Sequence, residues 1–222
     1  MTFYDRLYSE TAQERRAFLE IPLVKRAVAS GASRALYLAF LVEAYHHVKH
    51  TFPLLALAVS KTTDERYQDA LVEYMKEERG HEKWILNDIR DLGGDADAVS
   101  RGRAAAPCQI MVAYAYYAIE HVSPYAMLGS IHVLEGMSVL LADQLADAMK
   151  AMLGLTNDTG FSYLRSHGSL DVEHVALFKA FIDGFDDPAT QQVIIDSARI
   201  FYRLYGDIFR DLGAREAFRY AA

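Results

Sequence analysis

Carboxylate side chains occur inside helical segments that are otherwise apolar, and this placement indicates chemistry. Glu135 lies in the segment Ser130–Ala142, where nearly every neighbour is apolar, and Glu43 lies in a similar setting between Ala39 and Tyr45. Burial of a carboxylate costs several kcal/mol unless the group is protonated, paired with a cation or bound to a metal ion. Each of these glutamates therefore needs a partner, which an arginine or a tyrosine from elsewhere in the chain can also supply.

A Glu-x-x-His pattern supplies a second kind of donor. Glu78 and His81 are three residues apart, so a helix places them on one face, about 60° apart, where both can reach one ion. Carboxylate-bridged di-iron bundles use this arrangement, and solvated helix faces also carry it by chance. Glu77 with His81 is an equally good pairing. Glu43 and His46 form a second such pattern, but ferritin-like bundles carry the two on alternate helices, and these fall on consecutive ones.

A third pattern lies near the end of the chain. His167, Asp171 and His174 follow one another at i, i+4 and i+7, which on a helix fall within about 60° of arc. The intervening Gly168-Ser169 is expected to interrupt the helix, although a histidine one turn before a helix can still reach the same ion. A solvated polar stripe is the alternative interpretation of these three residues.

The combination favours a metal centre over separate polar residues. Four carboxylates balance the charge of two divalent ions, and three imidazoles add nitrogen donors. Oxygen and nitrogen donors without thiolate suit iron or manganese better than copper(I) or structural zinc. The sequence therefore predicts two Fe(II) ions, with Mn as the alternative metal. The candidate ligands are Glu43, Glu78, His81, Glu135, His167, Asp171 and His174.

The elements that position these residues are helices. Helical periodicity dominates, and strand alternation bounded by Asn-Gly or Asp-Gly turns is missing, so we predict an all-α fold. Pro53 is expected to kink its helix near His50 to Phe52. No repeat or Pro-rich linker divides the chain, which favours a single domain over residues 1–222. The expected helices span residues 4–18, 22–29, 32–59, 63–92, 107–121, 125–153, 160–167, 170–184 and 188–211, with a short tail helix.

Composition narrows the possible partners and compartment. A formal charge of −7 disfavours nucleic acid, because phosphate contacts need clustered Lys and Arg. Cys108 is the single cysteine, which excludes intramolecular disulfides and Cys-rich metal sites and fits a reducing cytoplasm. The start of the chain lacks a secretory signal, and the apolar run Ala104–Ile119 is shorter than the roughly 20 residues of a spanning helix, so no membrane partner is expected.

The order and spacing of these motifs over most of the chain resemble the haem-oxygenase-like di-iron oxidases, relatives of thiaminase II and of pyrroloquinoline-quinone-synthesis proteins. The resemblance implies a compact bundle of about seven or more helices, often dimeric, with a metal site in its middle. It also implies that all seven candidate residues ligate iron. Where some members carry a further glutamate, two turns before His81, this chain has Tyr74.

The resemblance implies an enzyme that uses O2 to oxidise a small organic substrate, such as an amine, an amino acid or a carboxylic acid, and that forms a homodimer. Apolar surroundings favour a substrate with aliphatic or aromatic character and one polar anchor. One alternative is a metal-free enzyme of the same superfamily, either a cofactorless oxidase or a thiaminase-like hydrolase with Cys108 as nucleophile. Another is a non-enzymatic helical binding protein.

Several further side chains have a possible supporting role. Histidines beside Glu43 can orient a ligand carboxylate or satisfy the core: His46, His47 and His50. Cations inside helices can hold a substrate carboxylate: Arg34, Lys83, Arg165 and Arg199. A group of tyrosines is more typical of packing than of electron transfer: Tyr114, Tyr116, Tyr117 and Tyr125. Cys108 follows Pro107 at a helix start without a neighbouring base, as a small core residue does.

Overall fold

The structure is a computed structural model that describes the backbone of residues 1–221 and the side chains outside 167–174 and 219–222. All regular secondary structure in this part is helical, which confirms the predicted all-α class. The helices are α1 (Phe3–Glu10), α2 (Ala12–Leu19), α3 (Pro22–Ser30), α4 (Arg34–Val48), α5 (Thr51–Ser60), α6 (Glu65–Glu78), α7 (His81–Asp91), α8 (Ala96–Arg101), α9 (Ala106–Tyr117), α10 (Ala126–Leu153), α11 (Ser162–Ile182) and α12 (Pro188–Ala221), with a π-helical turn at Ala118–Val122.

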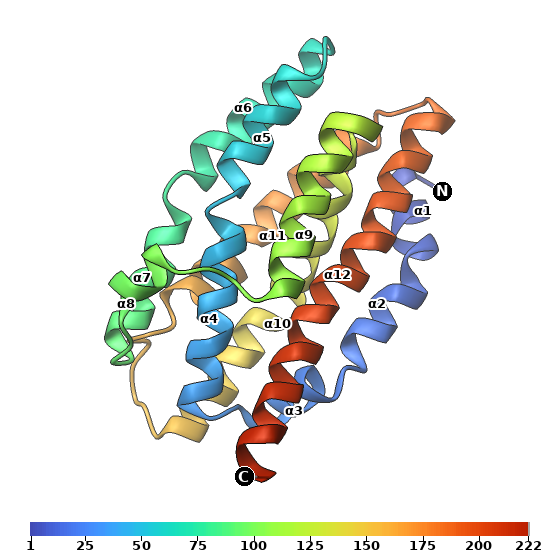
Figure 1. The fold of residues 1–222 in the computed structure, drawn as a ribbon. Coiled ribbons are helices and arrows are strands. Elements are labelled where there is room, and N and C mark those ends of the chain that lie inside the picture. Colours follow the sequence, from blue (N-terminus) through green and yellow to red (C-terminus); the bar gives the residue numbers. More distant parts are fainter. Residues whose placement is uncertain (222) are drawn as a thin grey trace.

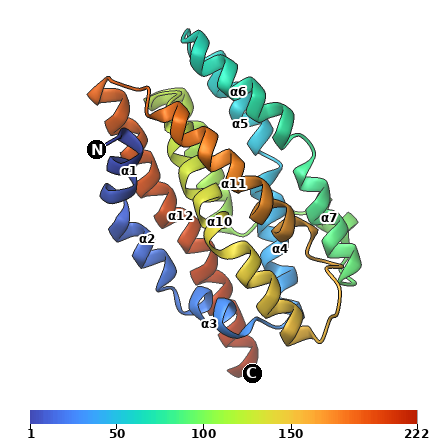
Figure 2. The ribbon, with the colours of Figure 1, turned by 180° about the vertical axis from the view of Figure 1, so that it is seen from behind.

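Helix α10 runs through the middle of the bundle (Figure 1), with α11 along one side (Figure 2). It packs most extensively against α11 and α12. Its buried side chains include Val133, Met137 and Ala146. The helix is long and apolar enough to cross a membrane, but 56% of its most apolar window is buried inside the molecule, as in a core helix. Glu135 therefore lies on the central helix of the fold.

The predicted helix over 32–59 is two helices. The side chain of Ser33 caps α4 by accepting from Leu36 N–H at 3.2 Å, and α4 ends at Val48. Helix α5 then begins at Thr51, with Pro53 in its first turn, where a backbone N–H would lack an intrahelical partner. The kink predicted near His50 thus coincides with a break between two helices.

The predicted helix over 63–92 is also divided. Helix α6 ends at Glu78 and α7 begins at His81, and Gly80 between them has φ +100°, a conformation that side chains with a Cβ rarely adopt. The prediction that Glu78 and His81 share the face of one helix was therefore wrong. The predicted helix over 4–18 divides in the same way at Thr11, into α1 and α2.

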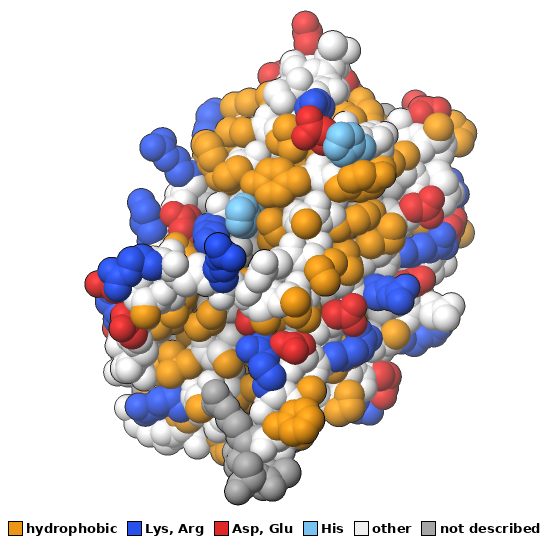
Figure 3. All heavy atoms as spheres, in the orientation of Figure 1, with side chains coloured by type: hydrophobic (Ala, Val, Ile, Leu, Met, Phe, Trp, Pro, Cys, Tyr) orange, Lys and Arg blue, Asp and Glu red, His pale blue; other side chains and the backbone are white. Residues whose placement is uncertain are grey.

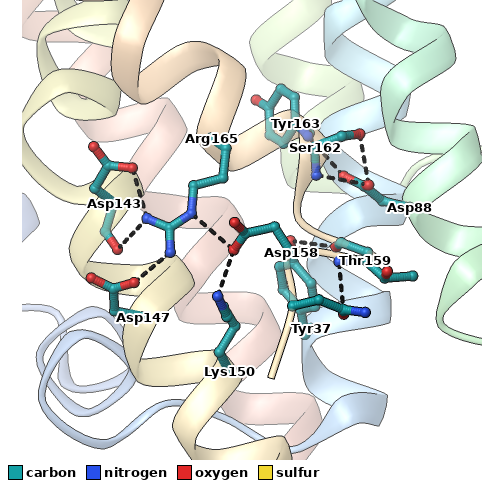
Figure 4. Close-up of polar contacts among 12 residues, drawn as sticks. Tyr37, Asp88, Asp143, Asp147, Lys150, Asp158, Thr159, Ser162, Tyr163 and Arg165 are labelled. Atoms are coloured by element: carbon teal, nitrogen blue, oxygen red, sulfur yellow. Dashed lines mark hydrogen bonds and ion pairs between the residues drawn. The ribbon is translucent and has the colours of Figure 1, made fainter. Parts of the chain in front are cut away.

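Helix α11 is continuous where a break was predicted. It runs through Gly168-Ser169, so the division between 167 and 170 was wrong, and α12 likewise absorbs the predicted tail helix. A carboxylate from α7 caps the start of α11: Asp88 accepts from Ser162 N–H at 2.9 Å and from Tyr163 N–H at 2.8 Å (Figure 4). These bonds fix the beginning of α11 to α7.

Arg165 secures the same corner of the fold. Its guanidinium pairs with Asp143 and Asp147 on α10 and with Asp158 in the preceding loop (Figure 4). Lys150 also binds Asp158, at 2.8 Å. The end of α10, the loop and the start of α11 are therefore tied together by a network of charges.

A buried histidine of α10 makes stability depend on pH. His132 is 5% exposed and packs near Tyr4, Thr11, Phe178 and Tyr202, and its burial, aided by the positive charge of Arg15, lowers its pKa to about 4. In the unfolded chain the pKa of histidine is about 6.5, so the unfolded state binds more protons between these two values. Acidification from about pH 7 to pH 5 is expected to remove about 2 kcal/mol of stability through this group.

Urea denaturation at the two pH values measures this loss. The variant His132→Leu should show a smaller difference between the two pH values than the wild type. His121→Asn serves as the control, because His121 is exposed in the π-helical turn, with its ring beside that of Tyr117. This variant should keep the difference between the two pH values. An unchanged difference in His132→Leu would contradict this assignment.

Candidate functional site

The candidate site is a cavity of about 90 Å³ between α10 and the helices around it, with room for several water molecules. Most of its wall is apolar, including Leu54, Leu55 and Phe201. The polar side chains in the wall come from helices that are distant in sequence. They are His47, Thr51, Tyr74, Glu78, Ser130, Glu135, Ser138, Tyr163 and Tyr205.

Two predicted ligands, Glu78 and Glu135, line this cavity from different helices. Glu135 is partly buried, less than its sequence neighbours suggested, because it borders the cavity. Its Oε2 accepts a hydrogen bond from the Tyr74 hydroxyl at 3.1 Å. Glu77 is exposed and does not border the cavity. Of the two adjacent glutamates, the one at the cavity is therefore Glu78.

Two histidines accompany the carboxylates. His81 is 5% exposed, its Nδ1 lies 3.4 Å from Oε2 of Glu78, and its ring stacks on Trp84 with centroids 4.1 Å apart. Its proximity to Glu78 therefore arises from the turn at Gly80. His47 lines the cavity directly, although the sequence indicated only a supporting role for it. Its position one turn after Glu43 is the signal that pointed to this face of α4.

Glu43 does not reach the cavity, unlike the other described carboxylate candidates. Its side chain is 3% exposed. Both of its carboxylate oxygens accept from Ala105 N–H, and the nearer one, Oε2, lies 3.0 Å from that nitrogen. The guanidinium of Arg215 lies 3.2 Å from its Oε1. An arginine thus balances this buried charge, which is the alternative that burial alone left open. The structure does not bring Glu43 together with Glu78 and Glu135.

The side chains of His167, Asp171 and His174 lie outside the described residues. Their backbone belongs to α11, which packs against α10 and α7, the helices that carry Glu135 and His81. Among side chains that the structure describes, no group of three or more His, Cys, Asp or Glu residues is placed to hold a metal ion. The carboxylate and imidazole donors at the cavity are of the kind that iron and manganese take, so they fit part of such a site.

The other cations singled out in the sequence have different roles. Arg165 binds three aspartates, and Arg199 pairs with Glu10 and Asp196. Of the tyrosines, Tyr116 contacts His50 at 3.1 Å and Tyr125 binds Asp64 at 3.0 Å. The described residues that line the cavity include none of these cations and none of the four tyrosines singled out in the sequence.

Cys108 is expected to be chemically inert in the folded protein. It is 1% exposed, and burial together with the nearby Glu43 carboxylate raises its pKa to about 12. Because thiolate is the reactive form, alkylation by iodoacetamide near pH 8 should be about a thousandfold slower than for a free cysteine. Mass spectrometry of native and urea-unfolded protein measures the two rates. Rapid modification of the native thiol would instead support the thiaminase-like alternative.

The architecture has close counterparts among solved structures. A domain of unknown function with a haem oxygenase-like fold from Shewanella denitrificans gives a TM-score of 0.88 at 21% identity, over 99% of this chain and 96% of that one. A TenA homologue from Pseudomonas syringae gives 0.78 at 12% identity, over 95% and 92%. Haem oxygenase-1 from Synechocystis, in complex with haem, gives 0.77 at 13%, over 100% and 96%. The chain therefore has the haem-oxygenase-like fold, as predicted.

Within that fold class the sequence identifies a family. Residues 38–206 match the family described as iron-containing redox enzymes. The chain belongs to this family. No curated protein matches the chain in sequence.

Proposed function

We propose that this protein is an O2-activating non-haem di-iron oxidase or oxygenase that acts on a small amine, amino acid or carboxylic acid. The observation that carries the proposal is that Glu78 and Glu135, from two different helices, line one cavity, with His81 beside Glu78. Membership of the iron-containing family supports iron as the metal. Manganese would suit the same donors.

The proposed ligands are Glu78, His81 and Glu135, together with His167, Asp171 and His174 of α11. His47 is the residue of α4 that the cavity offers in place of Glu43. When bound, ferrous iron supplies electrons to dioxygen at its open coordination positions.

The remaining wall of the cavity would orient and protect this site. The hydroxyl of Tyr74 donates to Glu135 and so fixes the direction of that carboxylate. Apolar side chains such as Leu54, Leu55 and Phe201 limit the entry of water. The hydroxyl of Thr51 can anchor a polar group of a substrate, whereas that of Ser130, which donates to Met127 O at 2.7 Å, can only accept.

A second cavity, also of about 90 Å³, adjoins the first and would hold the apolar part of the substrate. The two share Ser138, Tyr163 and Tyr205 as lining residues. The walls of the second cavity are almost wholly apolar and come mainly from α3, α4, α10 and α12. A substrate can therefore place an aliphatic or aromatic body there while its functional group lies near Glu135.

Anaerobic titration with Fe(II), followed by exposure to O2, tests the proposed function. We expect uptake of two Fe(II) ions per chain by metal analysis, and a change in the Mössbauer spectrum when O2 is added. A folded protein that takes up no Fe(II) and no Mn(II) would refute the proposal.

Substitution of Leu141 by tryptophan tests the second cavity. Leu141 lines this cavity and not the first, so the larger ring should fill space that the substrate chain needs. We expect KM for long straight-chain acids or amines to rise about tenfold, with little change for short ones. O2 consumption across a series of chain lengths measures the effect.

Leu140→Trp is the matched control, because Leu140 is 41% exposed on the outer side of the same helix. Its kinetics should remain close to the wild type. If Leu141→Trp affects all chain lengths equally, the second cavity does not bind the substrate chain.

A further inference from the structure

A polar depression lies outside the two cavities described above. It has a volume of about 300 Å³ and is lined by basic side chains from the α4–α5 junction and from the segment that leads into α9. On the left half of Figure 3, Lys and Arg side chains gather beside a histidine over this region. The basic residues in its wall are His46, Lys49, His50 and Arg103.

The depression is distinct from the first cavity. His46 and His47 are successive residues of α4, so their side chains leave the helix about 100° apart. His47 lines the first cavity and His46 lines the depression. Val112 is the one described residue that lines both, so ligand binding in the depression does not rest on the proposed iron ligands.

The hydrogen bond between His46 and Lys49 defines the role of the His46 ring at the depression. Lys49 Nζ lies 3.0 Å from His46 Nδ1, and an ammonium group can only donate, so Nδ1 is the acceptor. The proton of the neutral ring is then on Nε2. This Nε2–H donor is buried, in a residue that is 4% exposed, and it has no hydrogen-bond partner among the described residues. Because Nε2 has no exposed surface, a ligand in the depression does not reach it, and the ring acts at the depression through Nδ1, which accepts from Lys49.

The charge at the depression is positive. In the described part of the chain, neither Lys49 nor Arg103 forms an ion pair with a carboxylate. Glu43, one turn before His46 and His47 on α4, is already held by Ala105 N–H and Arg215.

We propose that this depression binds a small oxyanion, a carboxylate or a phosphate, through the charges of Lys49 and Arg103, with His46 Nδ1 holding the ammonium group of Lys49 in place. Charge-assisted hydrogen bonds of this kind are the strong ones, and an anion with several oxygens can accept from more than one donor at once. The basic groups converge on one depression and include no acidic partner among its described lining residues.

Titration of the purified protein with inorganic phosphate and, separately, with succinate tests the proposal. Sodium chloride keeps the ionic strength constant, and calorimetry and the melting temperature report binding. We expect saturable binding of at least one of the two probes, and the better probe distinguishes a phosphate from a carboxylate ligand. The variants Lys49→Met and Arg103→Met should each weaken this binding about tenfold or more.

Arg101→Met is the matched control, because Arg101 is an exposed cation two residues before Arg103 that does not line the depression. It should change the affinity less than about twofold. Equal weakening by all three variants would show general charge attraction and overturn the proposal, as would the absence of saturable binding by both probes. Titration of wild-type protein followed by the ¹⁵N signals of its histidine rings gives a second measurement. A shift of His46 Nδ1, which accepts from Lys49, is expected, and its absence at saturation also overturns the proposal.

Discussion

Substitution of Glu135 by glutamine is expected to lower the affinity for Fe(II) by more than about 100-fold, the upper range for residues that only support a ligand. The amide has the size of the carboxylate but lacks the charge that attracts a divalent cation. Its oxygen can still accept from the Tyr74 hydroxyl, which now bonds Glu135 at 3.1 Å, so the fold should be retained. Anaerobic equilibrium titration with Fe(II) measures the affinity, and circular dichroism checks the fold.

Substitutions of three other glutamates show whether the loss is specific to the proposed ligands. Glu78→Gln should cause a loss similar to that of Glu135→Gln, whereas Glu77→Gln should leave the affinity within about twofold, because Glu77 is exposed outside the cavity. Glu43→Gln should also spare iron binding while weakening the contact with Arg215. Loss of iron in Glu43→Gln as well as in Glu135→Gln would contradict the ligand set drawn from the structure and restore the one drawn from sequence spacing, and retention of iron in Glu135→Gln would contradict both.

The contrast between Glu43 and Glu135 shows what a sequence can and cannot reveal about a site. Both residues lie among apolar neighbours, and the physical requirement for a partner holds for both. The partner of Glu43 is Arg215, 172 residues further along the chain, and only the packing of α12 brings it near. Local sequence indicates that a buried charge must be balanced, but the tertiary fold decides which group balances it.

The sequence was sufficient to predict an all-helical fold, but not the residues at which individual helices begin and end. The apolar periodicity continues across Lys49-His50 and across Arg79-Gly80, so it predicts single long helices there. Helix α6 ends because the backbone of Arg79 is extended, with ψ 108°, and Gly80 follows with a positive φ; nothing in the neighbouring sequence requires these conformations. Glu78 and His81 nonetheless lie 3.4 Å apart, because a tight turn keeps residues close that a helix would also have kept close.

The reverse error occurred at Gly168-Ser169, where low helix propensity predicted a break and the helix continues. Propensity is a weak preference that tertiary contacts override. Here the start of α11 is held from outside the helix, by Asp88 of α7 and by the aspartates around Arg165. An anchored first turn supplies the costly nucleation step, and the following residues can then remain helical.

This explanation predicts that Asp88→Ala destabilises the protein by ~3 kcal/mol, because two backbone donors and one hydroxyl lose their acceptor in a buried place. Asp88 is 0% exposed and accepts from Ser162 N–H, Ser162 Oγ–H and Tyr163 N–H. Burial raises the pKa of Asp88, while the hydrogen bonds from Tyr163 and Ser162 oppose that rise. Urea denaturation near neutral pH measures the loss of stability.

Asp91→Ala is the control, since Asp91 is exposed at the end of the same helix, and it should change stability by less than about 0.5 kcal/mol. Asp88→Asn keeps one acceptor oxygen and should lose less than Asp88→Ala. Because α11 also carries His167, Asp171 and His174, loosening its first turn should reduce Fe(II) affinity although no proposed ligand is changed. If the Asp88→Ala variant unfolds at the same urea concentration as the wild type, the hydrogen bonds to Asp88 do not hold the start of α11. The continuity of that helix would then need a different physical cause.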